Sequence, residues 1–332
     1  MDSRCTRRLI GRPSRSTRSF SGMRRKKNLA LLAFFVSASL VLARGDEPLP
    51  HLPGYEAVPL HYGPYNEMVV TVMVNGHKAD FLLDTGSPFS LLGAGPAKAF
   101  GVQPVGADSK FGETTDVNGK SYKVGYVNSL TAGTMNFGGG PMALFGAYGV
   151  DSVSGRYHRD QFVGIVGADI LTRYKAVINC RTRTIFFRTG AQHLQLAKFA
   201  GAQHFARVPL REETSRSFTV PATLGSRPIR LLVDTGAPLT LLDQGLVQSS
   251  GMKLKATRAE QRFINGAYHP VMLGEIAGLK IGNFELPKQS LAVSQIPELL
   301  EANIHVAGLL GIDSLAFNRA IIDFDSMSLF LK

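Results

Sequence analysis

One stretch of eight residues occurs twice in this sequence. Residues 81–88 read FLLDTGSP and residues 231–238 read LLVDTGAP, 150 positions later. In each copy an apolar run typical of a buried strand leads to an acidic residue, Asp84 or Asp234, and the glycine that follows lets the backbone turn. Because one buried carboxylate is costly, two carboxylates from two copies of one unit indicate a facing pair that shares a proton.

The repeat extends well beyond these two motifs. Residues 58–101 align without a gap with residues 208–251. Each copy predicts a strand, a turn, a second strand, the Asp-Thr-Gly motif, and a short helix that ends at a glycine. The alternating strands are expected at Met68–Val74 and Phe218–Leu224. The sequence therefore predicts an all-β fold built from two homologous halves.

The first half is predicted at residues 55–190 and the second at residues 204–332, with residues 191–203 as the linker. Each half is expected to be a β-barrel-like lobe. The net charge of +12 is concentrated in residues 1–43, which hold ten of the 37 Lys and Arg and one of the 25 Asp and Glu. The remaining 27 basic and 24 acidic residues leave only +3, so we expect no nucleic-acid partner.

Two Asp-Thr-Gly motifs in one chain, each after an apolar strand, resemble those of the aspartic proteases, both pepsin-like and retroviral-protease-like. The resemblance implies a bilobal acid-protease-like fold with an active-site cleft between the lobes. It also implies an aspartic endopeptidase, a hydrolase in which Asp84 and Asp234 activate a water molecule between them. Such an enzyme is expected to act as a monomer on a peptide or protein substrate, with no metal and no cofactor.

The same resemblance gives roles to the residues beside the two acids. The hydroxyl groups of Thr85 and Thr235 are expected to hydrogen-bond across the seam between the lobes and to fix the two loops. Gly86 and Gly236 are expected to bring backbone N–H groups close to the carboxylates.

The two copies differ at Ser87 and Ala237. A hydroxyl at Ser87 can donate a hydrogen bond to Asp84 and favour its charged form. We therefore expect Asp84 to ionise more readily and Asp234 to hold the proton more often. On this hypothesis, Ser87→Ala raises the lower limb of the pH–rate profile.

A second hairpin is predicted after the motif in each half. In aspartic proteases a hairpin at this place is the flap that closes over the substrate; the alternative is an ordinary surface hairpin. The candidate flap residues are Asn118, Gly119, Tyr122, Asn265 and Gly266.

Asp169 and Asp313 each precede a short predicted helix near the end of a half. We interpret them as N-caps of those helices rather than as additional catalytic acids. Each half is expected to close with one strand, Ala176–Arg188 or Ala320–Leu331.

The first 43 residues are typical of a leader. Four basic residues at 24–27 precede an apolar run at residues 29–43, which predicts a secretory signal peptide cleaved near Ala43. The alternative is an uncleaved anchor, since the run is shorter than the roughly 20 residues of a membrane span. Translation starting at Met23 would leave residues 1–22 untranslated. We expect an exported protein, periplasmic or secreted, or anchored by residues 29–43.

Two other functions remain open from the sequence. One is a catalytically inactive peptide- or ligand-binding protein of the same fold, and the other is a structural protein anchored by the leader. Zinc-protease and nucleophile-elbow motifs are absent from the sequence. Cys180 is the only cysteine after the leader, so we expect a buried, inert thiol.

Overall fold

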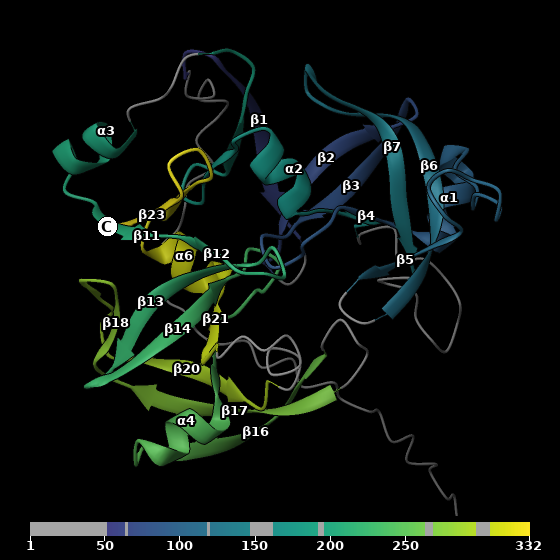
Figure 1. The fold of residues 1–332 in the computed structure, drawn as a ribbon. Helices are drawn as coiled ribbons and strands as arrows, with labels where there is room; N and C mark the ends of the chain where they lie inside the picture. The colour runs from purple at the N-terminus through teal and green to yellow at the C-terminus, as the bar shows by residue number, and fades with distance from the viewer. Residues whose placement is uncertain are drawn as a thin grey trace, which may run out of the picture. The chain divides into compact units, whose positions relative to one another are not determined.

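Strands dominate the structure, as the alternating sequence pattern predicts (Figure 1). The computed structural model describes residues 52–63, 66–117, 120–146, 162–191, 196–262, 268–296 and 306–332. The elements of the first half are β1 Tyr55–Tyr62, β2 Met68–Val74, β3 His77–Leu83, β4 Leu91–Gly93, α1 Ala94–Ala97, the 3-10 helix η1 Lys98–Phe100, β5 Thr114–Val117, β6 Lys120–Ala132, β7 Met135–Phe145, β8 Gly164–Val166, α2 Ala168–Arg173, β9 Val177–Asn179 and β10 Thr184–Arg188.

The second half repeats this order with small changes. Its elements are α3 Leu196–Ala202, β11 Ala206–Pro209, β12 Arg211–Glu212, β13 Phe218–Leu224, β14 Arg227–Val233, β15 Leu241–Asp243, α4 Gln244–Ser249, β16 Leu254–Arg262, β17 Tyr268–Ile276, β18 Leu279–Ile281, β19 Phe284–Glu285, β20 Gln289–Ser294, β21 Gly308–Leu310, α6 Ile312–Phe317, β22 Ile321–Asp323 and β23 Ser328–Leu331.

The predicted repeat of 150 residues is confirmed strand by strand. The bounds of β2, β3 and β4 lie 150 positions before those of β13, β14 and β15. The turn between β2 and β3 has φ of 49° at Asn75 and 82° at Gly76, the left-handed conformation that an Asn-Gly hairpin turn requires. Gly225 occupies the equivalent turn position in the second half, with a φ of 60°. Two copies of one local sequence pattern thus give two copies of one structure.

The strands of the first half close into a barrel. The sheet runs β2-β3-β8-β4-β7-β6, and β6 pairs back with β2 at Met73 and Thr131. Closure gives each strand a neighbour on both sides, which protects its backbone polar groups. The pairs β3–β8 and β4–β7 are parallel, which brings chain segments that are distant in sequence to one end of the barrel.

The second half makes the same closure with a broken strand. Where the first half has the long strand β6, the second has β17 and β18, separated by Gly278 with a φ of 70°. β17 pairs with β20, and β18 pairs with β13 at Ala222 and Ile281. The bend lets β17 and β18 together make the strand pairings that β6 alone makes in the first half.

The ends of the two halves join in one shared sheet. Its order is β11-β23-β22-β9-β10-β1, with three strands from each half and β9 antiparallel to β22 at the centre. The prediction of a single closing strand in each half is therefore wrong. Each closing segment is a hairpin, because the chain turns at Arg183 and Met327, where φ is 53° and 45°.

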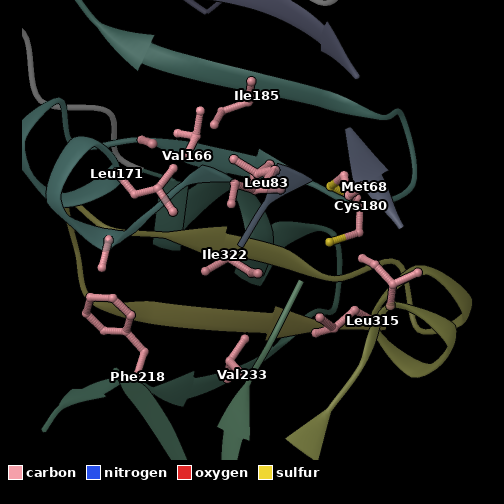
Figure 2. Close-up of a cluster of buried hydrophobic side chains, with 14 of the residues drawn as sticks. Met68, Leu83, Val166, Leu171, Cys180, Ile185, Phe218, Val233, Leu315 and Ile322 are labelled. Carbon is pink, nitrogen blue, oxygen red and sulfur yellow. The ribbon is translucent and has the colours of Figure 1, made fainter. Parts of the chain in front are cut away.

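The largest hydrophobic cluster also spans both halves. Leu83 and Val166 of the first half belong to the same cluster as Val233 and Ile322 of the second, as Figure 2 shows. Cys180 is fully buried in this cluster, which confirms its predicted burial, and burial raises the pKa of its thiol to about 12. A thiol that ionises so poorly is a weak nucleophile.

The predicted linker contains a helix, α3. Its Leu196 and Ala200 pack with Val177 and Phe330 of the shared sheet. The described residues form one compact unit, and the division at residues 191–203 stays a prediction. Within the described ranges no helix is long and apolar enough to cross a membrane; the apolar run at residues 29–43 lies outside them.

Candidate active site

Each predicted catalytic acid stands at the end of a buried strand. Asp84 follows β3, and its backbone N–H donates to the carbonyl of Val166 on the parallel neighbour β8 at 3.0 Å. Asp234 follows β14, and its N–H donates to Leu310 on β21 at 3.1 Å. These bonds fix where each loop leaves its barrel.

Each loop then holds one oxygen of its own acid with two backbone donors. The N–H groups of Gly86 and Ser87 donate to Oδ1 of Asp84 at 2.8 and 3.0 Å. Hydrogen bonds from N–H groups to a carboxylate fix its orientation and favour its charged form. The second loop makes the same pair of bonds to Asp234, from Gly236 at 2.9 Å and from Ala237 at 3.1 Å.

The two carboxyl groups meet where the loops face each other. The two side chains lie close enough for the charge of Asp234 to raise the pKa of Asp84. A Cβ on Gly86 would lie 2.9 Å from Cγ of Asp234, and one on Gly236 would lie 2.6 Å from Cγ of Asp84. Only glycine leaves room for the opposite acid, so the third residue of each motif is needed for this close approach.

The two threonines lock the loops together, as predicted. Oγ1 of Thr85 donates to the carbonyl of Val233 at 2.6 Å and accepts from the N–H of Thr235 at 3.0 Å. With the halves exchanged, Oγ1 of Thr235 donates to Leu83 at 2.6 Å and accepts from Thr85 at 3.1 Å. Both threonines are fully buried. The reciprocal bonds relate the two loops by an approximate twofold axis.

The expected role of the Ser87 hydroxyl is wrong. Its Oγ donates to the carbonyl of Phe89 at 2.8 Å, and not to Asp84. The expectation that Asp84 ionises more readily than Asp234 depended on that bond and falls with it. Because both loops give their acid the same two backbone donors, the proton belongs to the pair rather than to one member.

Burial is the main influence on the charge of the pair. It raises the pKa of both Asp84 and Asp234, and the charge of Asp234 raises the pKa of Asp84 still further. The N–H groups of the two loops oppose this rise. Two partly buried carboxyls held close together cannot both ionise cheaply, so the pair holds one proton at a pH where isolated aspartic acids have lost theirs.

The raised pKa values predict how stability depends on pH. The folded pair keeps protons that the unfolded chain releases near pH ~4, so its contribution to stability is complete below that pH and is lost as pH rises through the raised values. We expect chemical denaturation of Asp84→Asn to show a smaller loss of unfolding free energy over this range than the unmodified chain. Identical pH dependence in the two proteins would contradict the raised values.

Asp169 and Asp313 do not occupy the N-cap positions of their helices, so that prediction is wrong, although each accepts from one N–H of the first turn. Gly167 occupies the N-cap position of α2. Oδ1 of Asp169, inside the first turn, accepts from the N–H of Ile170 at 2.8 Å and also from the N–H and the hydroxyl of Ser90, at 2.9 and 2.7 Å. Asp313 of α6 accepts from Thr240 in the same way, at 2.7 Å from both groups.

Ser90 and Thr240 are positioning residues that sequence reasoning missed. The hydroxyl of Ser90 also accepts from the N–H of Gly167 at 3.0 Å, and Thr240 accepts from Gly311 at 3.1 Å. Each hydroxyl thus ties the loop after Asp84 or Asp234 to the helix behind it. The signal was present, because both halves keep a hydroxyl six residues after the acid.

The candidate flap is described only in part. β5 and β6 form the expected hairpin, with Tyr122 opposite Thr115 and partly buried against the cluster that contains Val117. The predicted tips Asn118, Gly119, Asn265 and Gly266 lie outside the described residues. A role for this hairpin as a flap stays a prediction.

Comparison with known proteins agrees with this geometry. The sequence matches the protein-family model described as Aspartyl protease over residues 70–170 and again over residues 220–314, more than half of the chain. The chain belongs to the aspartyl protease family. Each matched segment contains one Asp-Thr-Gly motif, so the two acids of this chain come from two copies of the family's unit.

Two solved structures are similar to this aspartyl protease. One is an aspartic proteinase from Irpex lacteus, with 15% identity and a TM-score of 0.44 over 83% of this chain and 96% of that chain. The other is Basic 7S globulin from soybean, with 10% identity and a TM-score of 0.46 over 86% of this chain and 95% of that chain. No curated protein sequence matches the chain.

Proposed function

We propose that the protein is an aspartic endopeptidase that hydrolyses peptide bonds with Asp84 and Asp234. One observation carries the proposal: each half presses its acid against the loop of the other half, so that a Cβ on Gly86 or Gly236 would lie 2.9 or 2.6 Å from Cγ of the opposite acid. Both residues remain partly accessible to solvent, as a site that uses water requires. A pair with one shared proton offers an acid and a base at one place.

The arrangement supports direct attack by water. The ionised carboxyl takes a proton from a water molecule as its oxygen bonds to the carbonyl carbon of the peptide. The protonated carboxyl donates a hydrogen bond to the carbonyl oxygen. When the C–N bond breaks, the leaving amine receives a proton from the pair, and the pair returns to one shared proton. The buried threonine bonds hold the two acids in place through these steps.

The proposal is tested by purifying the full chain and following cleavage of denatured proteins across a range of pH. We expect cleavage that pepstatin, a transition-state analogue, blocks, because such analogues bind to a carboxyl pair far more tightly than substrates do. Binding of peptides without any cleavage would favour the inactive binding protein of the same fold.

We propose further that the protein is exported and acts as a monomer on peptides or proteins. The proposal is supported by the basic and apolar leader and by the presence of both motifs in one chain. N-terminal sequencing of the protein recovered after cell fractionation tests it. A new N-terminus after Ala43 supports cleavage, an intact leader in the membrane fraction supports the anchor, and an intact chain in the cytoplasm refutes export.

A further inference from the structure

Two large apolar side chains are exposed on the segments that follow the catalytic acids. Phe89 and Leu239 are 37% and 51% exposed, and each lies five residues after a catalytic acid. Their backbones are fixed, since a Cβ on Gly167 or Gly311 would lie 2.5 or 2.4 Å from the main chain of Phe89 or Leu239. Exposed apolar side chains on a fixed backbone, in segments that follow the reacting groups, are suited to contact with a ligand.

A cation from the second half lies over one of these side chains. The guanidinium of Arg216 is 5.4 Å from the centre of the Phe89 ring, within the range of a cation–π contact. Arg216 lies in the tight turn between β12 and β13, where its φ is 62° and its N–H donates to the carbonyl of Glu213 at 2.8 Å. The turn therefore aims a positive charge across the seam at the loop that carries Asp84.

Arg216 forms no ion pair with any residue in the described part of the chain. The acid in its own turn, Glu213, is bound to Arg230 at 3.0 Å and accepts from Thr219 at 2.5 Å. Among the described residues no carboxylate forms an ion pair with Arg216, whose side chain is exposed. The guanidinium can thus bind an anionic group and keep its contact with the ring.

The opposite side of the seam lacks this charge. Asn66 stands 150 positions before Arg216, is exposed, and has the same left-handed backbone with a φ of 73°. Leu239 stands 150 positions after Phe89. The approximate twofold axis of the loops therefore relates a cationic and aromatic pair on one side to a neutral and aliphatic pair on the other.

We propose, on the basis of the proposed function, that this aspartyl protease selects peptides with an acidic residue on one side of the scissile bond. Arg216 and Phe89 bind the acidic side chain, the guanidinium through its charge and the ring through the methylene groups. Leu239 and Asn66 bind an apolar or neutral side chain on the other side. The substrate class is then a peptide that is acidic at one end of the binding site and apolar at the other.

The proposal is tested with the full chain and one apolar peptide in which single positions carry Glu or Gln. We expect kcat/KM to favour Glu about fivefold at positions on one side only, near the upper end of what an exposed ion pair contributes. Arg216→Gln abolishes the preference, and Arg216→Glu reverses it. Arg211→Gln, which removes an exposed charge that faces Glu213, leaves it unchanged. Added salt reduces the preference in the unmodified chain.

A binding measurement separates this proposal from the proposed function. The Glu and Gln peptides are titrated against full-length Asp84→Asn, with and without Arg216→Gln. Suppose that the unmodified chain cleaves nothing, but that the variant binds the Glu peptide more tightly and loses this preference with Arg216→Gln. This result supports the subsite and overturns the peptidase. Cleavage without a Glu preference, or with one that survives Arg216→Gln, overturns the subsite alone. If the chain neither cleaves nor binds these peptides, both the subsite and the peptidase proposals are wrong.

Discussion

Asp84→Asn is expected to lower kcat by at least about a thousandfold. General acid–base catalysis contributes roughly 10² to 10⁴ to a rate, and here one pair supplies both the acid and the base. The amide of Asn can still accept from the N–H groups of Gly86 and Ser87, so the loop should keep its shape. Steady-state cleavage of a fluorogenic peptide by the purified variant measures the loss.

Asp80→Asn is the matched control for this change. Asp80 lies four residues earlier on β3, is about half exposed, and accepts a hydrogen bond from Thr71 at 2.6 Å. Its replacement should leave kcat within about twofold, since surface substitutions have small effects. Turnover by Asp84→Asn at the rate of the unmodified chain would contradict the catalytic role. Unfolding of Asp84→Asn would instead mean that the carboxyl is needed for the fold.

Thr85→Val is expected to cost about 2–5 kcal/mol of unfolding free energy and most of the activity. Valine has nearly the same shape but removes two buried hydrogen bonds, one to the carbonyl of Val233 and one from the N–H of Thr235. Each buried group left without a partner costs roughly 1–3 kcal/mol. Chemical denaturation and a peptide assay on the same preparation measure both effects.

The approximate symmetry supplies the controls for Thr85→Val. Thr235→Val removes the reciprocal pair of bonds and should cost a similar amount. Thr85→Ser keeps the hydroxyl and loses only a methyl group, so it should retain most of the stability and activity. A Thr85→Val variant as stable and active as the unmodified chain would show that these bonds do not hold the site together.

Much of the site could be predicted because the repeat encodes it locally. The same local pattern of apolar strand, acid, hydroxyl and glycine occurs twice, 150 residues apart. It places Asp84 and Asp234 at equivalent strand ends, and the structure brings the two acids together. Gly86 and Gly236 were predicted for their N–H groups. The structure adds a second reason, the lack of room for a Cβ beside the opposite acid.

Other features depend on contacts that no local pattern reveals. The hydroxyl of Ser87 can rotate toward any nearby acceptor, and it donates its hydrogen bond to the carbonyl of Phe89. Asp169 lies at a helix start and accepts there from the N–H of Ile170, but it also accepts from Ser90, 79 residues away in sequence. The pairing of β9 with β22 likewise joins the two halves, and no alternation of apolar and polar residues in the sequence indicates it.

Titration of the two carboxyl groups by carbon-13 NMR tests the central claim most directly. The aspartic acids of the full chain are labelled, and Asp84→Asn and Asp234→Asn assign the two signals. We expect two separated steps, with the later one well above the ordinary value of about 4, and the loss of this coupling in either variant. Two independent titrations near the ordinary value would show that Asp84 and Asp234 do not share a proton.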